Sequence, residues 1–301
     1  CNTNGILDVC EADCDGDFVP DDCEIADGAE DCDGNGVPDV CDAADGALTD
    51  INNDGIFDAC QTLDYSGLVT EILPIQSRSG VPVMPATAVR YRVYATFADA
   101  SASVISMYGD PARPMVVEVP GGFYQHPQGG NLADTVTCFV PGQPLQAYDS
   151  WFTFTEVCSQ GQDVQSVGVN FTPFNAGDGL NVDDGLLYML PGSPETVAGS
   201  DGRVLLMQLT VNVGTAEDGS PVLPQIRLNL AGNNADGSDW QGFEQLAPAP
   251  ELLDCNANGI HDAYDIANAS SLDCDVDGIP DECQDCNGNG VPDDCEGLID
   301  C

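Results

Sequence analysis

A twelve-residue frame, repeated near both ends of the chain, constrains this protein more than any other feature of its sequence. The frame reads D-C-[DN]-x-[DN]-G-[VI]-x-D-x-C-[DEQ], with single departures in some copies. Its six complete copies span residues 13–24, 31–42, 50–61, 254–265, 273–284 and 285–296. Residues 1–11 carry the frame without its first position, and Asp300-Cys301 match the start of another copy. Because repeats at a fixed frame mark a repeated structural unit, we expect each copy to fold alike.

The residue types in the frame predict calcium sites. A twelve-residue calcium loop supplies oxygen ligands from positions 1, 3, 5, 7, 9 and 12, with glycine at position 6 for the sharp turn. Asp, Asn, Glu or Gln occupies positions 1, 3, 5, 9 and 12 of every complete copy, and position 7 would offer its carbonyl oxygen. The predicted ligands are Asn2, Asn4, Asp8, Glu11, Asp13, Asp15, Asp17, Asp21, Glu24, Asp31, Asp33, Asn35, Asp39, Asp42, Asp50, Asn52, Asp54, Asp58, Asp254, Asn256, Asn258, Asp262, Asp265, Asp273, Asp275, Asp277, Asp281, Asp285, Asn287, Asn289, Asp293, Glu296 and Asp300.

Three copies have residues that should weaken binding at positions that matter for affinity. Phe18 replaces the turn glycine of the loop 13–24, although that loop has five carboxylates at ligand positions. Gln61 and Gln284 end their loops without a bidentate carboxylate. We therefore expect weak to moderate affinities, on the order of 10⁻⁴ to 10⁻³ M for some sites, as in other extracellular calcium modules.

The charge balance points to cations as partners. The chain has a net charge of −45, six arginines and no lysine. Of its 51 acidic residues, 31 lie in residues 1–61 and 254–301, where there is no Lys or Arg. Nucleic acids and anionic membranes are bound through Lys and Arg, so this composition excludes both. No apolar run is long enough to span a bilayer, which predicts no membrane insertion.

The 15 cysteines indicate an oxidising, extracellular or cell-surface location. Zinc is less suitable than calcium here, because the cysteines lie within loops rich in Asp and Asn. Two pairings stay open. Pairing within loops gives Cys14–Cys23, Cys32–Cys41, Cys274–Cys283, Cys286–Cys295 and Cys1–Cys10; pairing between loops gives Cys10–Cys14, Cys23–Cys32, Cys283–Cys286 and Cys295–Cys301. Two further bridges are predicted: Cys60–Cys255, because each of these cysteines lies in a loop that lacks the second cysteine, and Cys138–Cys158, because these are the only cysteines of the middle segment.

The spacing of the loops argues against paired EF-hand helices. The frames begin 12 to 19 residues apart, and proline stands at position 8 in four of them. Because proline disfavours the helix interior, we expect irregular, disulfide-linked loop arrays; dockerins are disfavoured for the same reason. The arrays resemble thrombospondin type 3 repeats, whose tandem acidic units wrap around Ca²⁺ with little secondary structure. The wording D-C-N-G-N-G-V-P-D-D-C-E of residues 285–296 is also similar to repeats in surface proteins of planctomycete-type bacteria.

Residues 62–253 form a different kind of segment, for which we predict one antiparallel β-sandwich, jelly-roll-like, between the arrays 1–61 and 254–301. Apolar and polar residues alternate over 89–97, 167–171, 205–213 and 226–230, and turn residues separate these runs. Its resemblance is only to secreted bacterial β-sandwiches in general.

The sequence predicts no enzyme. His126 and His261 are the only histidines, and no nucleophile or metalloprotease motif is present. A pair of carboxylates for glycoside hydrolysis is the one catalytic class that stays open. Trp151, Trp240 and Tyr124 could form a sugar platform, but isolated aromatics on strands belong more often to a core. The acidic clusters at 178–184 and 234–239 are expected to be solvated turns.

We therefore predict a calcium-stabilised extracellular structural protein, whose copies assemble head to tail into a filament, matrix fibre or stalk. The interruption of the frame near both ends predicts that the chain is one period of something longer. The alternative is an adhesion module, in which the sandwich binds polysaccharide or another surface protein and the arrays are spacers.

Overall fold

A computed structural model describes residues 7, 10–73, 88–127, 129–133, 148–154, 164–190, 192–212, 223–249, 255, 262–267, 270–273 and 279–284. The strands are β1 (Tyr65–Leu73), β2 (Ala88–Phe97), β3 (Ser103–Gly109), β4 (Met115–Glu118), β5 (Trp151–Phe152), β6 (Gln165–Val167), β7 (Leu180–Val182), β8 (Gly185–Tyr188), β9 (Arg203–Asn212), β10 (Gln225–Asn233) and β11 (Asp239–Leu246). The helices are α1 (Asp21–Asp27), α2 (Asp39–Asp45), α3 (Thr172–Asn175) and α4 (Asp262–Ala267), and 3-10 turns are η2 (Asp58–Cys60), η5 (Pro194–Thr196), η6 (Gly199–Asp201) and η7 (Asp281–Cys283).

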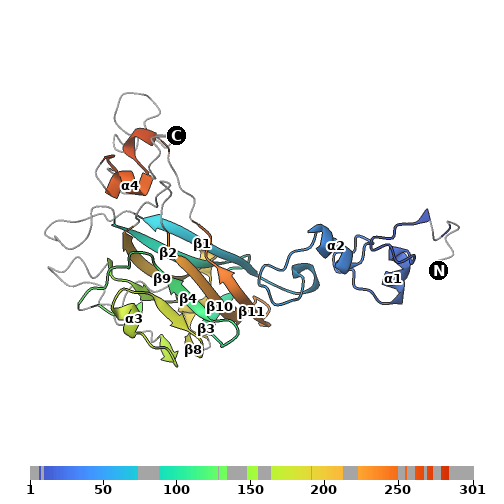
Figure 1. The fold of residues 1–301 in the computed structure, drawn as a ribbon, viewed down its shortest axis with the longest axis horizontal. Coiled ribbons are helices and arrows are strands. Elements are labelled where there is room, and N and C mark those ends of the chain that lie inside the picture. The colour runs from blue at the N-terminus through green and yellow to red at the C-terminus, as the bar shows by residue number, and fades with distance from the viewer. Residues whose placement is uncertain are drawn as a thin grey trace.

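The centre of the chain is an antiparallel β-sandwich, as expected (Figure 1). One sheet has the order β1-β2-β9-β5, and the second has the order β6-β8-β3-β10-β4-β7, with β11 paired to β10. The strand pairs described in both sheets are antiparallel; for example, Tyr91 of β2 lies opposite Leu209 of β9. The alternation predicted for β2 is confirmed, because Val89, Tyr91 and Val93 are fully buried. Burying each such side chain contributes roughly 1.5–3 kcal/mol.

One predicted strand is wrong. The run 167–171 was expected to continue as a strand, but β6 ends at Val167, which is exposed. Gly168 adopts a left-handed conformation (φ 73°), and a Cβ there would lie 2.3 Å from the carbonyl oxygen of Asp184. The chain turns at this glycine and then enters α3.

Aromatic side chains join the two sheets near the N-terminal array. Tyr65 of β1 stacks on Trp240 of β11, with ring centroids 4.7 Å apart. The ring of Phe97 packs edge-on against both of them. Trp240 and Trp151 are 4% and 1% exposed, so both tryptophans belong to the core. A sugar platform built on them is therefore excluded.

The loop arrays contain short helices, which corrects the expectation of irregular loops. α1 and α2 begin at position 9 of the frame, directly after Pro20 and Pro38 at position 8. Both prolines are extended (φ −63° and −60°) and stand at the N-cap, so they start the helices instead of breaking them. Gly28 and Gly46 end the helices in left-handed conformation. Proline disfavours the helix interior but is compatible with the N-cap, which is why the expectation was wrong.

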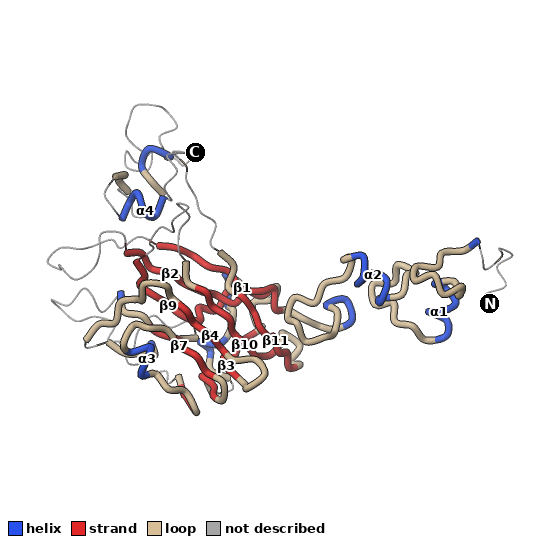
Figure 2. The backbone as a smooth tube through the Cα atoms, viewed as in Figure 1, coloured by secondary structure: helices blue, strands red, loops and turns tan. Residues whose placement is uncertain are grey.

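The N-terminal array extends away from the sandwich as an arm, with α1 farther from the sheets than α2 (Figures 1 and 2). α4 of the C-terminal array lies beside β2. Within the described residues, no helix is both long and apolar enough to cross a membrane.

Candidate metal centres

The acidic loops share a closure made by backbone hydrogen bonds. The N–H at position 9 donates to the carbonyl oxygen of the residue preceding the loop, with distances of 2.8–2.9 Å, at Asp21, Asp39, Asp58 and Asp281. The N–H at position 11 donates to the carbonyl at position 8 in the same four loops. Identical bonds in loops from both arrays confirm that the repeated frame is one structural unit.

Carboxylates close each loop from the inside. In the loop 31–42, both oxygens of Asp31 at position 1 accept backbone N–H groups, from Asn35 at 3.1 Å and Gly36 at 3.1 Å. Asp50 accepts the equivalent bonds in the loop 50–61. At position 9, Asp39 accepts the N–H of Cys32 at 2.9 Å. Hydrogen bonds within the loop thus fix the carboxylates at positions 1 and 9.

The last position of the frame reaches back to position 5. Asn35 Nδ2 donates to Asp42 Oδ2 at 2.9 Å and also to Asp33 Oδ2 at 3.1 Å. In the loop 50–61, Gln61 Nε2 donates to Asp54 Oδ1 at 3.3 Å. Positions 3, 5 and 12 therefore face one another, as ligands of one ion must.

The loop 13–24 gathers the most negative charge. Single carboxylate oxygens of Asp13, Asp15 and Asp17 lie within 4.8 Å of one another. Burial and then the charges of Asp15, Asp17, Asp21 and Asp13 raise the pKa of Glu24. Carboxylates this close repel unless a cation lies between them. The cluster can therefore hold a metal ion, and an all-oxygen set suits a hard cation.

Some of the buried oxygen atoms without a hydrogen-bond partner in the described part of the chain lie at ligand positions. Examples are Asn52 Oδ1 at position 3, Asp262 Oδ2 at position 9 and Glu24 Oε2 at position 12. Asn52 and Asp262 are 0% and 2% exposed. An unsatisfied buried oxygen costs about 1–3 kcal/mol. A bound cation at each loop would satisfy these atoms.

Two positions of the frame have left-handed backbone, positions 4 and 6, and only position 6 was predicted from the sequence. Position 6 has φ 86° at Gly36, 88° at Gly55 and 76° at Phe18. Position 4 is also left-handed, at Gly16, Gly34 and Asn53. The glycines and asparagine at position 4 were the overlooked signal. Phe18 is 90% exposed, so its side chain gains no packing in return for the strained backbone.

Replacing Phe18 with glycine is expected to strengthen metal binding at the loop 13–24. Left-handed backbone costs a residue with a side chain roughly 1–2 kcal/mol, so Phe18→Gly should lower the dissociation constant about 5- to 30-fold if the loop orders on binding. Isothermal titration calorimetry with CaCl₂ measures the change. Phe18→Ala is the matched control, because it removes the ring but keeps the strain. Equal gains from both substitutions would contradict the backbone explanation.

The disulfides follow a register that neither predicted scheme contains. Cys14 bonds to Cys41, and Cys32 bonds to Cys60. In the C-terminal array, Cys255 bonds to Cys283. Each bridge joins position 2 of one loop to position 11 of the next loop. The predictions Cys14–Cys23, Cys32–Cys41, Cys10–Cys14, Cys23–Cys32, Cys274–Cys283, Cys283–Cys286 and Cys60–Cys255 are therefore wrong.

The physical reason lies in the short helix that leaves each loop. Position 11 lies within that helix, and its cysteine is buried in α1 and α2. The bridge therefore fastens the helix of one unit to the loop of the preceding unit. The constant spacing between positions 2 and 11 favoured pairing within loops. That spacing results from the repetition of the frame and does not show which cysteines pair. Cys10, at position 11 of the first frame, is an exposed free cysteine.

Part of the predicted site lies outside the described residues. These ligands are Asn2, Asn4, Asp8, Asp254, Asn256, Asn258, Asp275, Asp277, Asp285, Asn287, Asn289, Asp293, Glu296 and Asp300. The predicted bridges Cys138–Cys158, Cys286–Cys295, Cys295–Cys301 and Cys1–Cys10 involve such residues as well, as does His261.

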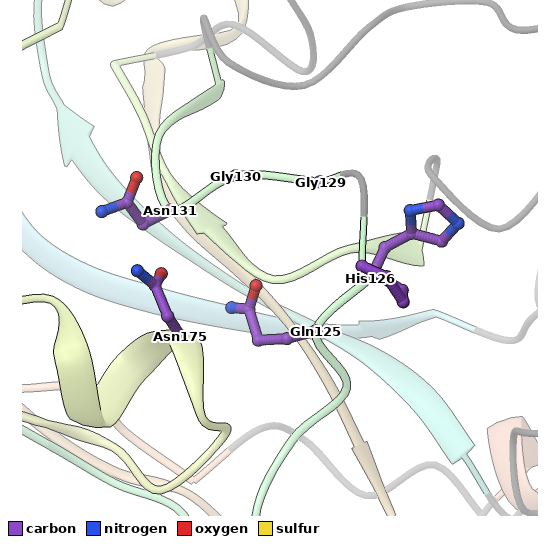
Figure 3. A pocket seen from close by; sticks show the side chains of 7 residues that line it. Gln125, His126, Gly129, Gly130, Asn131 and Asn175 are labelled. Atoms are coloured by element: carbon purple, nitrogen blue, oxygen red, sulfur yellow. The ribbon is translucent and has the colours of Figure 1, made fainter.

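The sandwich carries one polar pocket of interest. Figure 3 shows the side chains of Gln125, Asn131 and Asn175 around one hollow, while the ring of His126 points away from them. The fully buried Asp149 accepts the backbone N–H of His126, one of the lining residues, at 2.7 Å. Burial raises the pKa of Asp149. The lining amides suit a neutral, hydroxyl-rich ligand better than a charged one.

The other acidic cluster with described contacts serves as a turn. Asp236 accepts the N–H and the hydroxyl of Ser238, which lowers the pKa of Asp236. Asn234 is buried, and its Nδ2 donates a hydrogen bond to the carbonyl oxygen of Thr62 at 2.9 Å. The cluster at 234–239 therefore fastens the β10–β11 turn to the segment before β1.

Comparison with known proteins adds no family: no family model, no curated protein and no solved structure matches this chain.

Proposed function

We propose that the protein is a calcium-stabilised extracellular structural subunit, in which disulfide-linked calcium loops form stiff extensions of a β-sandwich. The observation that carries this proposal is the repetition of one closed loop in both arrays, together with the converging carboxylate oxygens of the loop 13–24. Calcium fits the donor set, because carboxylate, amide and carbonyl oxygens at six positions of a twelve-residue loop are its preferred ligands. Cations would also offset the 31 uncompensated negative charges of the two arrays.

A structural role is favoured over a regulatory one. The described loops have a short helix or 3-10 turn only at their C-terminal end, and Cys41 of α2 and Cys60 of η2 are each bonded to the preceding loop. A calcium sensor needs two helices that can separate and expose a groove. Fastened units instead make a rod whose stiffness depends on bound metal.

The disulfide register supports a proposal of head-to-tail assembly. In the three described bridges, a cysteine at position 11 pairs with position 2 of the preceding loop. Cys10 occupies position 11 and is free and exposed. Cys286 and Cys301 occupy position 2 of the last frames. We propose that one of them, in another copy, pairs with Cys10 and that the contact propagates as a filament.

Cys10→Ser is expected to abolish covalent assembly. In CaCl₂ and air, the two thiols would lose two protons and two electrons to dioxygen and form the bridge. Non-reducing electrophoresis should then show a ladder for the original protein and a monomer for the variant. The same experiment with dithiothreitol controls for non-covalent contact. A ladder that persists in the variant, or a bridge from Cys10 within its own chain, would contradict the assignment.

A second candidate function is binding of a polysaccharide through the amide-lined pocket of Figure 3. The three converging amides are the observation that favours it. This pocket would replace the tryptophan platform, because both tryptophans are buried.

A further inference from the structure

The loop 50–61 differs from its neighbours because it is fastened to the sandwich. Asn52 Nδ2 donates to the carbonyl oxygen of Gln241 at 2.8 Å, and Asn53 Nδ2 donates to that of Phe243 at 3.0 Å. In return, the N–H of Phe243 donates to Asn52 O at 2.7 Å. These bonds cover the outer edge of β11, which would otherwise expose unpaired backbone groups.

β11 is irregular near the residues that bind the loop. β11 departs from regular pairing with β10 between Leu228 and Leu230. Glu244 at this irregularity has φ 50°, which is uncommon for a residue with a side chain. On the other side of the loop, a Cβ at Gly67 of β1 would lie 3.6 Å from Ile51 Cδ1. Ile51 of the loop thus lies beside Gly67 of β1.

A ligand position of the loop is buried in this contact. Asn52 stands at position 3 and is 0% exposed, and its Oδ1 has no hydrogen-bond partner. Its amide nitrogen is already used by Gln241 O and by Asp54 Oδ2 at 2.9 Å. The carboxamide is therefore oriented by the sandwich, with its oxygen left for another ligand. Asp50 and Asp54 supply carboxylates at positions 1 and 5 of the same loop.

We infer that the loop 50–61 is a divalent-cation site that couples metal binding to the stability of the β-sandwich and fixes the arm to β11. The inference rests on the proposed calcium-binding function and assigns a special role to one of its sites. A cation on Asn52 Oδ1 requires the docked orientation of Asn52. Binding therefore stabilises the docked state by a free energy that increases with the logarithm of the free-ion concentration divided by the dissociation constant. The loops 13–24 and 31–42 have no described hydrogen bond to the sandwich.

The test uses the two tryptophans, Trp151 and Trp240, which both lie in the sandwich. Thermal unfolding followed by tryptophan fluorescence therefore reports the sandwich alone. At CaCl₂ about 100-fold above the dissociation constant, the unfolding midpoint of the original protein should rise by about 5–10 °C over its value in EGTA. Asp50→Asn combined with Asp54→Asn should remove most of this rise.

The matched control is Asp31→Asn combined with Asp33→Asn, which removes the two carboxylates from the same part of the loop 31–42. This variant should keep the rise. The quantity compared is the rise with calcium, so a general loss of stability in either variant does not affect the test. An equal rise in both variants would overturn the coupling.

Equilibrium dialysis with ⁴⁵Ca²⁺ separates this inference from the proposed function. Bound calcium with no rise of the midpoint would overturn the coupling and leave the calcium-built arm intact. No bound calcium at all would overturn both.

Discussion

Chelation of calcium is expected to release the backbone N–H groups of Asp21 and Asp39 to solvent while the sandwich stays folded at 25 °C. These two groups donate to the carbonyl oxygens of Ala12 and Glu30 and close the outer loops of the arm. The arm has 18 acidic residues and no basic residue, so without cations its loops repel themselves open. Exchange of these amides should accelerate about 100-fold or more, which corresponds to about 2.7 kcal/mol of metal-linked stability.

Hydrogen exchange with peptide-level mass spectrometry measures this effect. Peptides from β2 are the internal control, because Tyr91 and Val93 are fully buried in the core and should keep their protection. A second control replaces CaCl₂ with NaCl at equal ionic strength, which screens charges without supplying a ligand. Protection that survives chelation, or that NaCl restores, would contradict metal-dependent closure.

Removal of one disulfide bridge is expected to lower the stability of the arm by about as much as chelation of calcium does. Cys32→Ser combined with Cys60→Ser opens a crosslink of 28 residues, which fastens α2's loop to the loop docked on β11. Crosslinks of this length contribute about 3–4 kcal/mol, chiefly by restricting the unfolded chain. The arm should lose a comparable part of its stability, and calcium affinity at the loop 31–42 should fall with it.

Cys10→Ser is the control, with the monomer fraction of each variant compared, because it removes one sulfur but keeps the bridges Cys14–Cys41 and Cys32–Cys60. Urea unfolding followed by exchange of arm peptides, in saturating CaCl₂, compares the variants. Equal stability of the double variant and the control would show that the bridge does not hold the arm.

The sequence predicted the repeated loop well, because ligand spacing is local information. Converging oxygens at positions 1, 3, 5 and 12 follow from the order of residues within one frame. The same holds for the strain at Phe18, which occupies the left-handed position that glycine occupies in other copies. Strands with strict alternation, such as β2, were equally accessible.

Features that depend on contacts between loops, or between a loop and the sandwich, could not be predicted from the sequence. The bridges Cys14–Cys41 and Cys32–Cys60 depend on where α1 and α2 direct position 11, and sequence spacing does not contain that direction. The helices themselves were missed because proline at the N-cap was treated as a breaker. The docking of Asn52 on β11 joins residues about 190 positions apart, which no local pattern predicts.

Negative-stain electron microscopy of the protein in millimolar CaCl₂, repeated after EGTA, tests the proposed structural function most directly. We expect rows of beads joined by thin stalks in calcium and separate beads without ordered stalks after chelation. Separate beads in both conditions would contradict the filament and would direct attention to the amide-lined pocket of the sandwich.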